Sequence, residues 1–376
     1  MTLEPFLLER IQSKWEHVVD INLTESGVLP LSIQELAPGQ NDQNGILDIA
    51  LGYSQTNGTM PLRETIASMY PGATADNILV TNGGAEANFL TIWNLLEESD
   101  KQNQVIMMQP NYNQISGISP ALGGIVTPYY LEMRHGEWVP DLESLKEQVS
   151  KETLFITVCN PNNPTGAVIK PTHLKAITEI AADYDTWILS DEVYQGAEMN
   201  GVETPSMFKQ YEKVIVTNSL SKAYGLPGLR LGWIVAHDEN HVESLWAYSD
   251  YTTICPSIIS DKLATIALQP GKRIELINRA TKIVRRNWAT MQNWLDTHNE
   301  IFEYVAPMAA SICFPKHNLP LSSLEFAERL RREKSVLIAP GEHFGMEKHL
   351  RIGFGHSEKE LTRGLSLIDE MIENLK

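Results

Sequence analysis

Short apolar segments rich in branched side chains alternate with longer segments of helical periodicity along the first two thirds of the chain. Amphipathic segments at 85–96 and 174–184 predict helices between the apolar segments. Alternation of this kind indicates an α/β domain built on a largely parallel sheet. Six of the short segments predict buried strands, at residues 78–81, 105–109, 154–159, 187–190, 214–217 and 231–236.

The pattern changes near residue 257. A long helical stretch at 260–298 leads to short apolar segments at 336–339 and 350–354, and a closing helix is expected at 359–375. We interpret this part as a smaller α+β domain. The expected division is an N-terminal arm and part of the small domain at 1–45, a large domain at 46–265 and the small C-terminal domain at 266–376.

Polar and glycine residues follow four of the predicted strands. They are the pair Gly83-Gly84, the run Asn-Pro-Asn-Asn-Pro-Thr-Gly at 160–166, the run Asp-Glu-Val-Tyr at 191–194, and the segment 218–230 around Lys222. Ligands of open parallel sheets bind beyond the carboxyl ends of the strands. The sequence therefore predicts one shared site at this edge.

Each of these residues has a functional and an ordinary interpretation. Gly83 and Gly84 before a helix suit an anion, but glycine also marks any strand-to-helix turn. Asn163 lies in a rigid turn at a strand end. Asp191 is either a helix cap or the partner of a buried cation. Lys222 is either a surface charge or a desolvated amine of the kind that Schiff-base chemistry requires.

Composition excludes several classes of protein. The chain has 30 Lys and Arg against 47 Asp and Glu, a net charge of −17, which argues against nucleic-acid binding but not against a small anionic ligand. Cys159, Cys255 and Cys313 form no CxxC pair, so we expect no metal site and no disulfide framework. A signal peptide and a membrane-spanning segment are not expected either, which predicts a cytoplasmic protein without membrane partners.

Three motifs carry a family resemblance: the run at 160–166, Ser-Asp-Glu-Val-Tyr at 190–194, and Ser-Leu-Ser-Lys-Ala-Tyr-Gly-Leu-Pro-Gly-Leu-Arg-Leu-Gly-Trp at 219–233. Over residues 45–355 the chain resembles the fold-type I pyridoxal-phosphate enzymes, specifically the class I/II aminotransferases. The resemblance implies a large domain with a mostly parallel seven-stranded sheet flanked by helices. The segment 219–233, together with 22–28, also resembles capreomycidine synthase-like members.

The resemblance implies roles around pyridoxal 5'-phosphate. Lys222 is expected to form the internal aldimine and, once released, to act as the base. Asp191 is expected to keep the pyridinium nitrogen protonated. Tyr194 and Asn163 are expected to hydrogen-bond the phenolic oxygen. Lys222, Asp191 and Tyr194 are thus the expected catalytic residues.

Further cofactor contacts follow from the same resemblance. Tyr112 is expected to stack on the ring, and Tyr53 to reach the phosphate bound by a neighbouring subunit. The last role predicts a homodimer with shared sites. The phosphate of the same subunit is expected to contact Ser219, Arg230 and the backbone of Gly83, Gly84 and Ala85.

The substrate side is expected to use Arg351 as the clamp for an α-carboxylate, with Asn163 and Gly27. The predicted partners are thus an amino acid and a keto acid. Residues 251–260, where dicarboxylate-specific members carry a second arginine, contain none here. A preference for aspartate or glutamate through that arginine is therefore not predicted. The acidic excess of the chain is expected on the outer surface.

Several alternative functions are compared with this interpretation. The run Ser219–Lys222 also fits an S-x-x-K motif, but the accompanying K-T-G and S-D-N motifs are absent. The dinucleotide fingerprint G-x-G-x-x-G is absent too. A regulator that uses this fold to sense a ligand would need a DNA-binding domain before the segment that resembles the family, which begins at residue 45. Within the cofactor family, transamination is the default, and cyclisation or β/γ-elimination and replacement remain open because fold does not fix function.

Overall fold

The central sheet of the computed structural model, which describes residues 3–99 and 103–375, has eight strands in the order β2-β9-β8-β7-β6-β3-β4-β5. Strands β3, β4, β6, β7 and β8 are parallel, whereas β9 runs antiparallel to β8 and β2. The bounds are β2 (Ile78–Thr81), β3 (Gln104–Gln109), β4 (Ile125–Arg134), β5 (Glu137–Pro140), β6 (Thr153–Cys159), β7 (Trp187–Asp191), β8 (Val214–Ser219) and β9 (Gly232–Ala236).

The six predicted strands are all present, with ends that agree to within two residues. The expected mostly parallel α/β sheet is confirmed, with eight strands where seven were expected. The added strand β5 pairs antiparallel with β4 at the edge of the sheet. The sequence did not indicate β4, which lies next to the edge strand β5. Most residues of β4 are partly exposed, and polar residues interrupt its apolar run.

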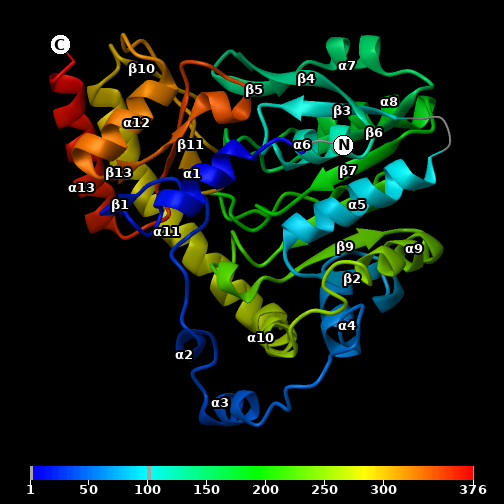
Figure 1. Cartoon of the computed structure of the whole chain (residues 1–376). Helices are drawn as coiled ribbons and strands as arrows, with labels where there is room; N and C mark the ends of the chain where they lie inside the picture. The colour runs from blue at the N-terminus through cyan, green and yellow to red at the C-terminus, as the bar shows by residue number, and fades with distance from the viewer. Residues whose placement is uncertain (1–2, 100–102, 376) are drawn as a thin grey trace.

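Helices cover both faces of this sheet (Figure 1). Successive strand residues face opposite sides, so Leu79 packs in one core while Ile78 and Val80 pack in the other. The first face carries α5 (Gly84–Glu98), α6 (Gln114–Ala121) and α9 (Glu239–Ser249). The opposite face carries α4 (Met60–Ala67), α7 (Leu142–Gln148), α8 (Pro171–Asp183) and α10 (Ile258–Leu268).

The expected helical stretch at 260–298 consists of two helices, α10 and α11 (Pro270–Thr297), separated at Gln269. Proline suits the first turn of a helix, where its missing N–H has no helical partner, so Pro270 begins α11 and does not interrupt a longer helix. A second core lies between α11, α12 (Ser323–Lys334) and α13 (Glu358–Glu373).

Short strands accompany this second core. A three-stranded sheet has the order β11 (Ile312–Cys313), β15 (Leu350–Gly353), β14 (Ala339–Pro340), and β10 (Phe302–Glu303) pairs with β12 (Lys316–His317). From the N-terminal segment, β1 (Ile21–Asn22) pairs parallel with β13 (Val336–Leu337). Short 3-10 helices lie at Ala75–Asn77, Met207–Lys209, Pro227–Leu229 and Gly341–Phe344.

The remaining N-terminal helices are α1 (Leu7–Trp15), α2 (Ile33–Leu36) and α3 (Gln40–Leu47). In Figure 1, α2 and α3 extend away from the sheet and the second core. Across the described residues, no helix combines the length and apolar character needed to cross a membrane. The domain boundaries near residues 45 and 265 stay a prediction.

Candidate active site

A cavity of about 430 Å³ opens at the carboxyl ends of β6, β7 and β8. Cys159, Asp191 and Ser219, the last residues of these three strands, all line it. Neighbouring parallel strands thus bring together side chains that are far apart in the sequence. The wall is completed by α1, by residues 25 and 26, by the first turns of α5 and by Arg351 from β15.

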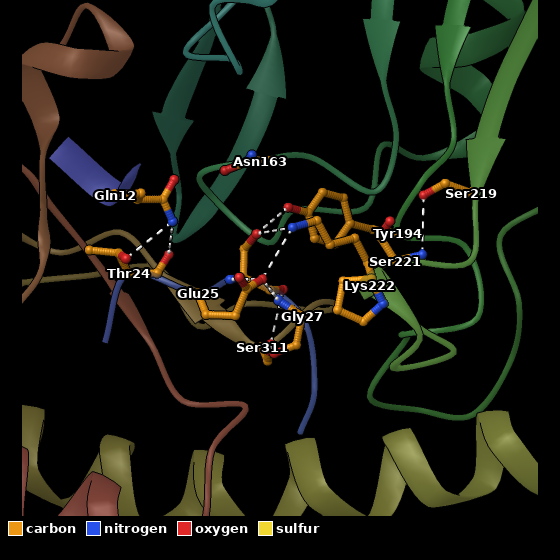
Figure 2. A network of polar contacts seen from close by, with 12 residues as sticks. Gln12, Thr24, Glu25, Gly27, Asn163, Tyr194, Ser219, Ser221, Lys222 and Ser311 are labelled. Carbon is orange, nitrogen blue, oxygen red and sulfur yellow. Dashed lines mark hydrogen bonds and ion pairs between the residues drawn. The ribbon is translucent and has the colours of Figure 1, made fainter. Parts of the chain in front are cut away.

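Lys222 has two polar partners in the cavity. Its Nζ atom donates to Oε1 of Glu25 at 3.2 Å and to Oγ of Ser26 at 2.9 Å. The same Ser26 hydroxyl accepts a hydrogen bond from the Tyr194 phenol at 2.8 Å. Figure 2 shows these side chains converging from the N-terminal segment and the sheet edge. Ser26 therefore links the amine to the phenol.

The Lys222–Glu25 contact sets the charge of both groups. The Lys222 ammonium lowers the pKa of Glu25 to about 2, and backbone N–H groups of Ser26 and Gly27 also donate to its Oε1. Burial is the largest single effect on the pKa of Lys222 and lowers it, but the Glu25 carboxylate and the Tyr194 phenol together leave this pKa raised. The pair is thus an ion pair in which the amine carries its proton.

Asp191 is a buried carboxylate at the end of β7. Burial raises its pKa, while donors from Val193 N at 3.1 Å and Asn88 Nδ2 at 3.3 Å favour the ionised form. Asn88 is itself oriented by the Thr217 hydroxyl, which donates to its Oδ1. The carboxylate is therefore fixed in place and has no basic side chain bonded to it among the described residues.

Arg351 is a buried guanidinium that enters from β15. Its Nη1 donates to Oδ1 of Asn163 at 2.8 Å and its Nη2 donates to the Thr24 carbonyl at 2.7 Å. Its Nε is buried and has no hydrogen-bond partner within the described residues. Burial lowers the pKa of Arg351. A buried cation with an unused donor suits an anionic ligand group.

A second anion-binding region lies at the first turn of α5. Its backbone N–H groups have no partners within the helix, and Gly84 and Ala85 line the cavity. Gly83 caps this helix with φ of +96°, and a Cβ there would lie 2.6 Å from Nη2 of Arg230. Glycine thus lets the Arg230 guanidinium lie directly against the helix start, with Ser219 nearby in the cavity wall.

The structure brings most of the predicted site residues together. Tyr112 also lines the cavity, where its hydroxyl donates to Glu9 at 2.5 Å. Gly83 lies just behind the wall, against Arg230. The predicted residues in the wall are Gly84, Ala85, Tyr112, Asn163, Asp191, Tyr194, Ser219, Lys222, Arg230 and Arg351.

Two predicted residues lie elsewhere. Gly27 does not line the cavity. Its N–H donates to Glu25, and its carbonyl accepts from Ser311 at 2.9 Å. Tyr53 is 89% exposed and is not part of the cavity of this chain.

Other cavity residues were not identified from the sequence. They include Glu25 and Ser26, the orienting Asn88, and Glu9, Gln12 and Glu16 from the α1 region. Glu25 and Ser26 lie inside the segment 22–28 that supported the finer resemblance, which was the available signal. The residues of α1 carry no motif, and only tertiary packing brings them to the cavity.

Comparisons with known proteins agree with this geometry. The family model for aminotransferase class I and II matches residues 22–368. Capreomycidine synthase of Streptomyces vinaceus is 28% identical over 313 residues, which cover 83% of this chain and 79% of that protein.

Two solved structures are similar over their whole length. A PLP-dependent aminotransferase from Streptococcus suis 89-1591 has a TM-score of 0.92 and 30% identity, covering 100% of this chain and 99% of that one. The PLP-dependent cyclase OrfR has a TM-score of 0.88 and 25% identity, covering 100% and 98%. The chain therefore belongs to the class I and II aminotransferases, fold-type I enzymes that use pyridoxal phosphate.

Proposed function

We propose that the chain is a pyridoxal-phosphate-dependent aminotransferase that moves the amino group of an L-amino acid to a keto acid. The cofactor is attached at Lys222, and Arg351 holds the substrate α-carboxylate. The observation that carries the proposal is the content of one cavity. It combines an amine, a buried carboxylate at Asp191 and two separate anion-binding regions, one at Arg351 and one at Arg230 with the start of α5.

The residues present fit the cofactor. The glycine at 83 leaves room for Arg230 beside the helix start, which makes a cradle suited to a phosphate. Asp191 is a fixed, buried carboxylate suited to a protonated ring nitrogen. In our assignment Ser219, Arg230, Gly84 and Ala85 hold the phosphate, Asn163 and Tyr194 bond the phenolic oxygen, and Tyr112 stacks on the ring.

The mechanism divides between cofactor and chain. Bound pyridoxal phosphate supplies an electron sink that acidifies the α-hydrogen of an amino acid. Arg351 orients the substrate through its α-carboxylate. Nζ of Lys222 accepts the α-proton and later returns a proton. Ser26 holds Nζ and the Tyr194 hydroxyl within hydrogen-bond distance, which keeps the amine positioned for both transfers.

A second function has specific support. Both capreomycidine synthase and the cyclase OrfR are similar to this chain over most of its length. The same cavity groups serve cyclisation, elimination or replacement, since all of these also begin with removal of the α-proton. Glu25 places a carboxylate next to Lys222, and a second proton acceptor beside the amine is what removal of a further substrate proton would use.

The test is an amino-acid panel followed by mass spectrometry. Purified protein should show an absorption band at about 400 nm. Lys222→Ala should keep the cofactor but lose turnover. Lys146→Ala, which changes an exposed lysine, should retain turnover. Keto acid formed only with an added acceptor supports transfer. Ammonia or a cyclised product formed without an acceptor supports the second function. Full turnover by Lys222→Ala contradicts both.

We also propose a homodimer, in which Tyr53 of the partner subunit completes the phosphate site. Large apolar side chains are exposed at the end of α3 and in the segment that follows it: Leu47 at 80%, Leu51 at 80% and Tyr53 at 89%. Exposed apolar side chains gathered in one region are typical of an interface. Light scattering should give twice the chain mass. The cytoplasmic location stays a prediction.

A further inference from the structure

The cavity has an acidic side that the proposed function does not use. Glu9 and Glu16 come from the α1 region, and Glu25 follows β1 by a few residues. All three line the cavity. They come from the N-terminal segment, whereas the proposed cofactor contacts Asp191, Ser219 and Lys222 come from the sheet edge. This side therefore faces the substrate.

The partners of the three carboxylates are uncharged, exposed or taken by the reaction. Glu9 accepts from the neutral Tyr112 hydroxyl at 2.5 Å, and Glu16 lies 3.4 Å from the exposed His17. Glu25 has an ammonium partner, Lys222, and its side chain is only 33% exposed. In the proposed function Lys222 first carries the cofactor and is then a neutral amine until it accepts the α-proton. Glu25 is without the ammonium partner while the substrate binds and until that proton has moved.

No other basic side chain is available to replace that cation. In the wall formed by the described residues, the remaining basic groups are Arg230 and Arg351. The proposed function assigns Arg230 to the phosphate and Arg351 to the α-carboxylate. A partly buried carboxylate without a positive partner is costly, and a positive ligand group removes that cost. An acidic ligand side chain would meet three negative charges instead.

The position of Glu25 sets what it can reach. The preceding residue, Thr24, gives its carbonyl to Nη2 of Arg351 at 2.7 Å. Arg351, which holds the α-carboxylate in the proposed function, is thus bonded to Thr24, the residue next to Glu25. A substrate held at Arg351 therefore extends its side chain along the wall that carries Glu25, and α1 closes this wall with Glu9 and Glu16.

We propose, on the basis of the proposed function, that the cavity selects L-amino acids whose side chain ends in an ammonium or guanidinium group. Glu25 is the principal specificity-determining residue, and Glu9 and Glu16 add to it from α1 and its C-terminal end. Amino acids with acidic side chains are rejected. Residues 251–260 contain no second arginine, which agrees with the rejection of acidic side chains. That absence alone does not specify which side chain is favoured.

The experiment compares charged and neutral amino acids of the same shape on the holoenzyme. L-arginine is paired with L-citrulline and L-lysine with L-norleucine, and L-glutamate is added. Binding is followed by the change in cofactor absorption, and KM is measured separately. We expect the cationic member of at least one pair to bind about tenfold or more tightly than its neutral match, with L-glutamate weakest.

Variants then assign the selectivity. Glu25→Gln keeps the shape and removes the charge, so the advantage of the cationic member should disappear while the neutral member binds as before or more tightly. Glu9→Gln, which lies on α1, should reduce the advantage by a smaller factor and serves if Glu25→Gln does not fold. Glu143→Gln, an exposed glutamate on α7, is the matched control and should change nothing.

Each result is decisive. Equal binding within both pairs, or L-glutamate binding as tightly as the cations, overturns this inference and leaves the proposed function intact. Unchanged selectivity in Glu25→Gln removes the role of Glu25. If no amino acid of any class alters the cofactor absorption, the proposed function fails and this inference fails with it.

Discussion

Nη1 of Arg351 donates to Oδ1 of Asn163 at 2.8 Å, a contact between residues 188 positions apart. Asn163 lies in the turn after β6, and Arg351 lies on β15, so the contact joins the main sheet to the second core. The amide uses one donor of the guanidinium and fixes its plane. Arg351 lines the cavity, and its Nε is buried without a hydrogen-bond partner within the described residues, so this donor is unused.

Arg351→Lys should therefore raise KM for the amino acid about 10- to 100-fold, because an ammonium cannot make the fork-shaped pair with a carboxylate. The cofactor absorption should be unchanged. Steady-state kinetics with one donor amino acid measure this effect. Arg363→Lys, an exposed arginine on α13, is the control. A variant with unaltered KM would place the α-carboxylate elsewhere.

Asp191→Asn should lower kcat by about 100-fold or more, since the amide cannot hold a ring nitrogen protonated. The amide oxygen can still accept from Val193 N, but the amide NH2 group cannot accept from Asn88 Nδ2. The side chain should stay at the end of β7, so the variant should still bind the cofactor. Kinetics and cofactor absorption on one preparation separate the two effects. Retained kcat would contradict the assignment of Asp191 to the ring.

Gly83→Ala should weaken cofactor binding by about tenfold. The backbone φ of +96° is unfavourable for alanine, and the added Cβ would lie 2.6 Å from Arg230 Nη2. Displacement of the guanidinium is the expected relief. The cofactor dissociation constant measures the effect. Gly117→Ala in α6 is the matched control, because its Cβ meets no atom within 4 Å. Equal dissociation constants would show that Arg230 does not depend on Gly83.

His317 predicts a pH dependence of stability. Burial, with Lys348 and His349 nearby, lowers the pKa of this imidazole from 6.5 to about 4. Between these values the unfolded chain binds the proton and the folded chain does not. The free energy of unfolding therefore falls as the pH falls from 6.5 towards 4, by at most about 1.4 kcal/mol per pH unit.

Urea unfolding of the wild type and His317→Gln at several pH values checks this prediction. The variant should show a shallower loss of stability across the window, although His343, whose pKa is also lowered to about 4, should retain part of it. His17→Gln changes an imidazole that is 90% exposed, so its profile should match the wild type. Parallel profiles for wild type and His317→Gln would contradict the assignment.

The residues at the sheet edge of the cavity were predictable because they follow strands. Asp191, Ser219 and Asn163 each lie at or just after the carboxyl end of a buried apolar run, and parallel strands bring such ends to one edge. Their polar character at that position was visible in the sequence. The predicted role of Tyr53 depends on a second chain, and the substrate role of Gly27 stays a prediction whose backbone groups are bonded to Glu25 and Ser311.

The acidic side of the cavity was not predictable in the same way. The acidic excess was expected on the outer surface, and three of those glutamates line the cavity instead. Glu9 lies on the amphipathic helix α1, and Glu16 follows its last residue. In the sequence, the polar face of this helix cannot be distinguished from a face that contacts solvent. Which surface that face covers depends on long-range packing.

The sequence by itself determined the α/β class, the positions of six buried strands along the chain, the family and the residues at the strand ends. Strand periodicity and glycine, proline and polar residues at strand ends are local properties, so they can be read along the chain. The tertiary structure decided what Lys222 faces and what encloses the substrate side. The Lys222–Glu25 contact spans 197 residues, and its 3.2 Å distance follows from packing of the N-terminal segment against the sheet edge.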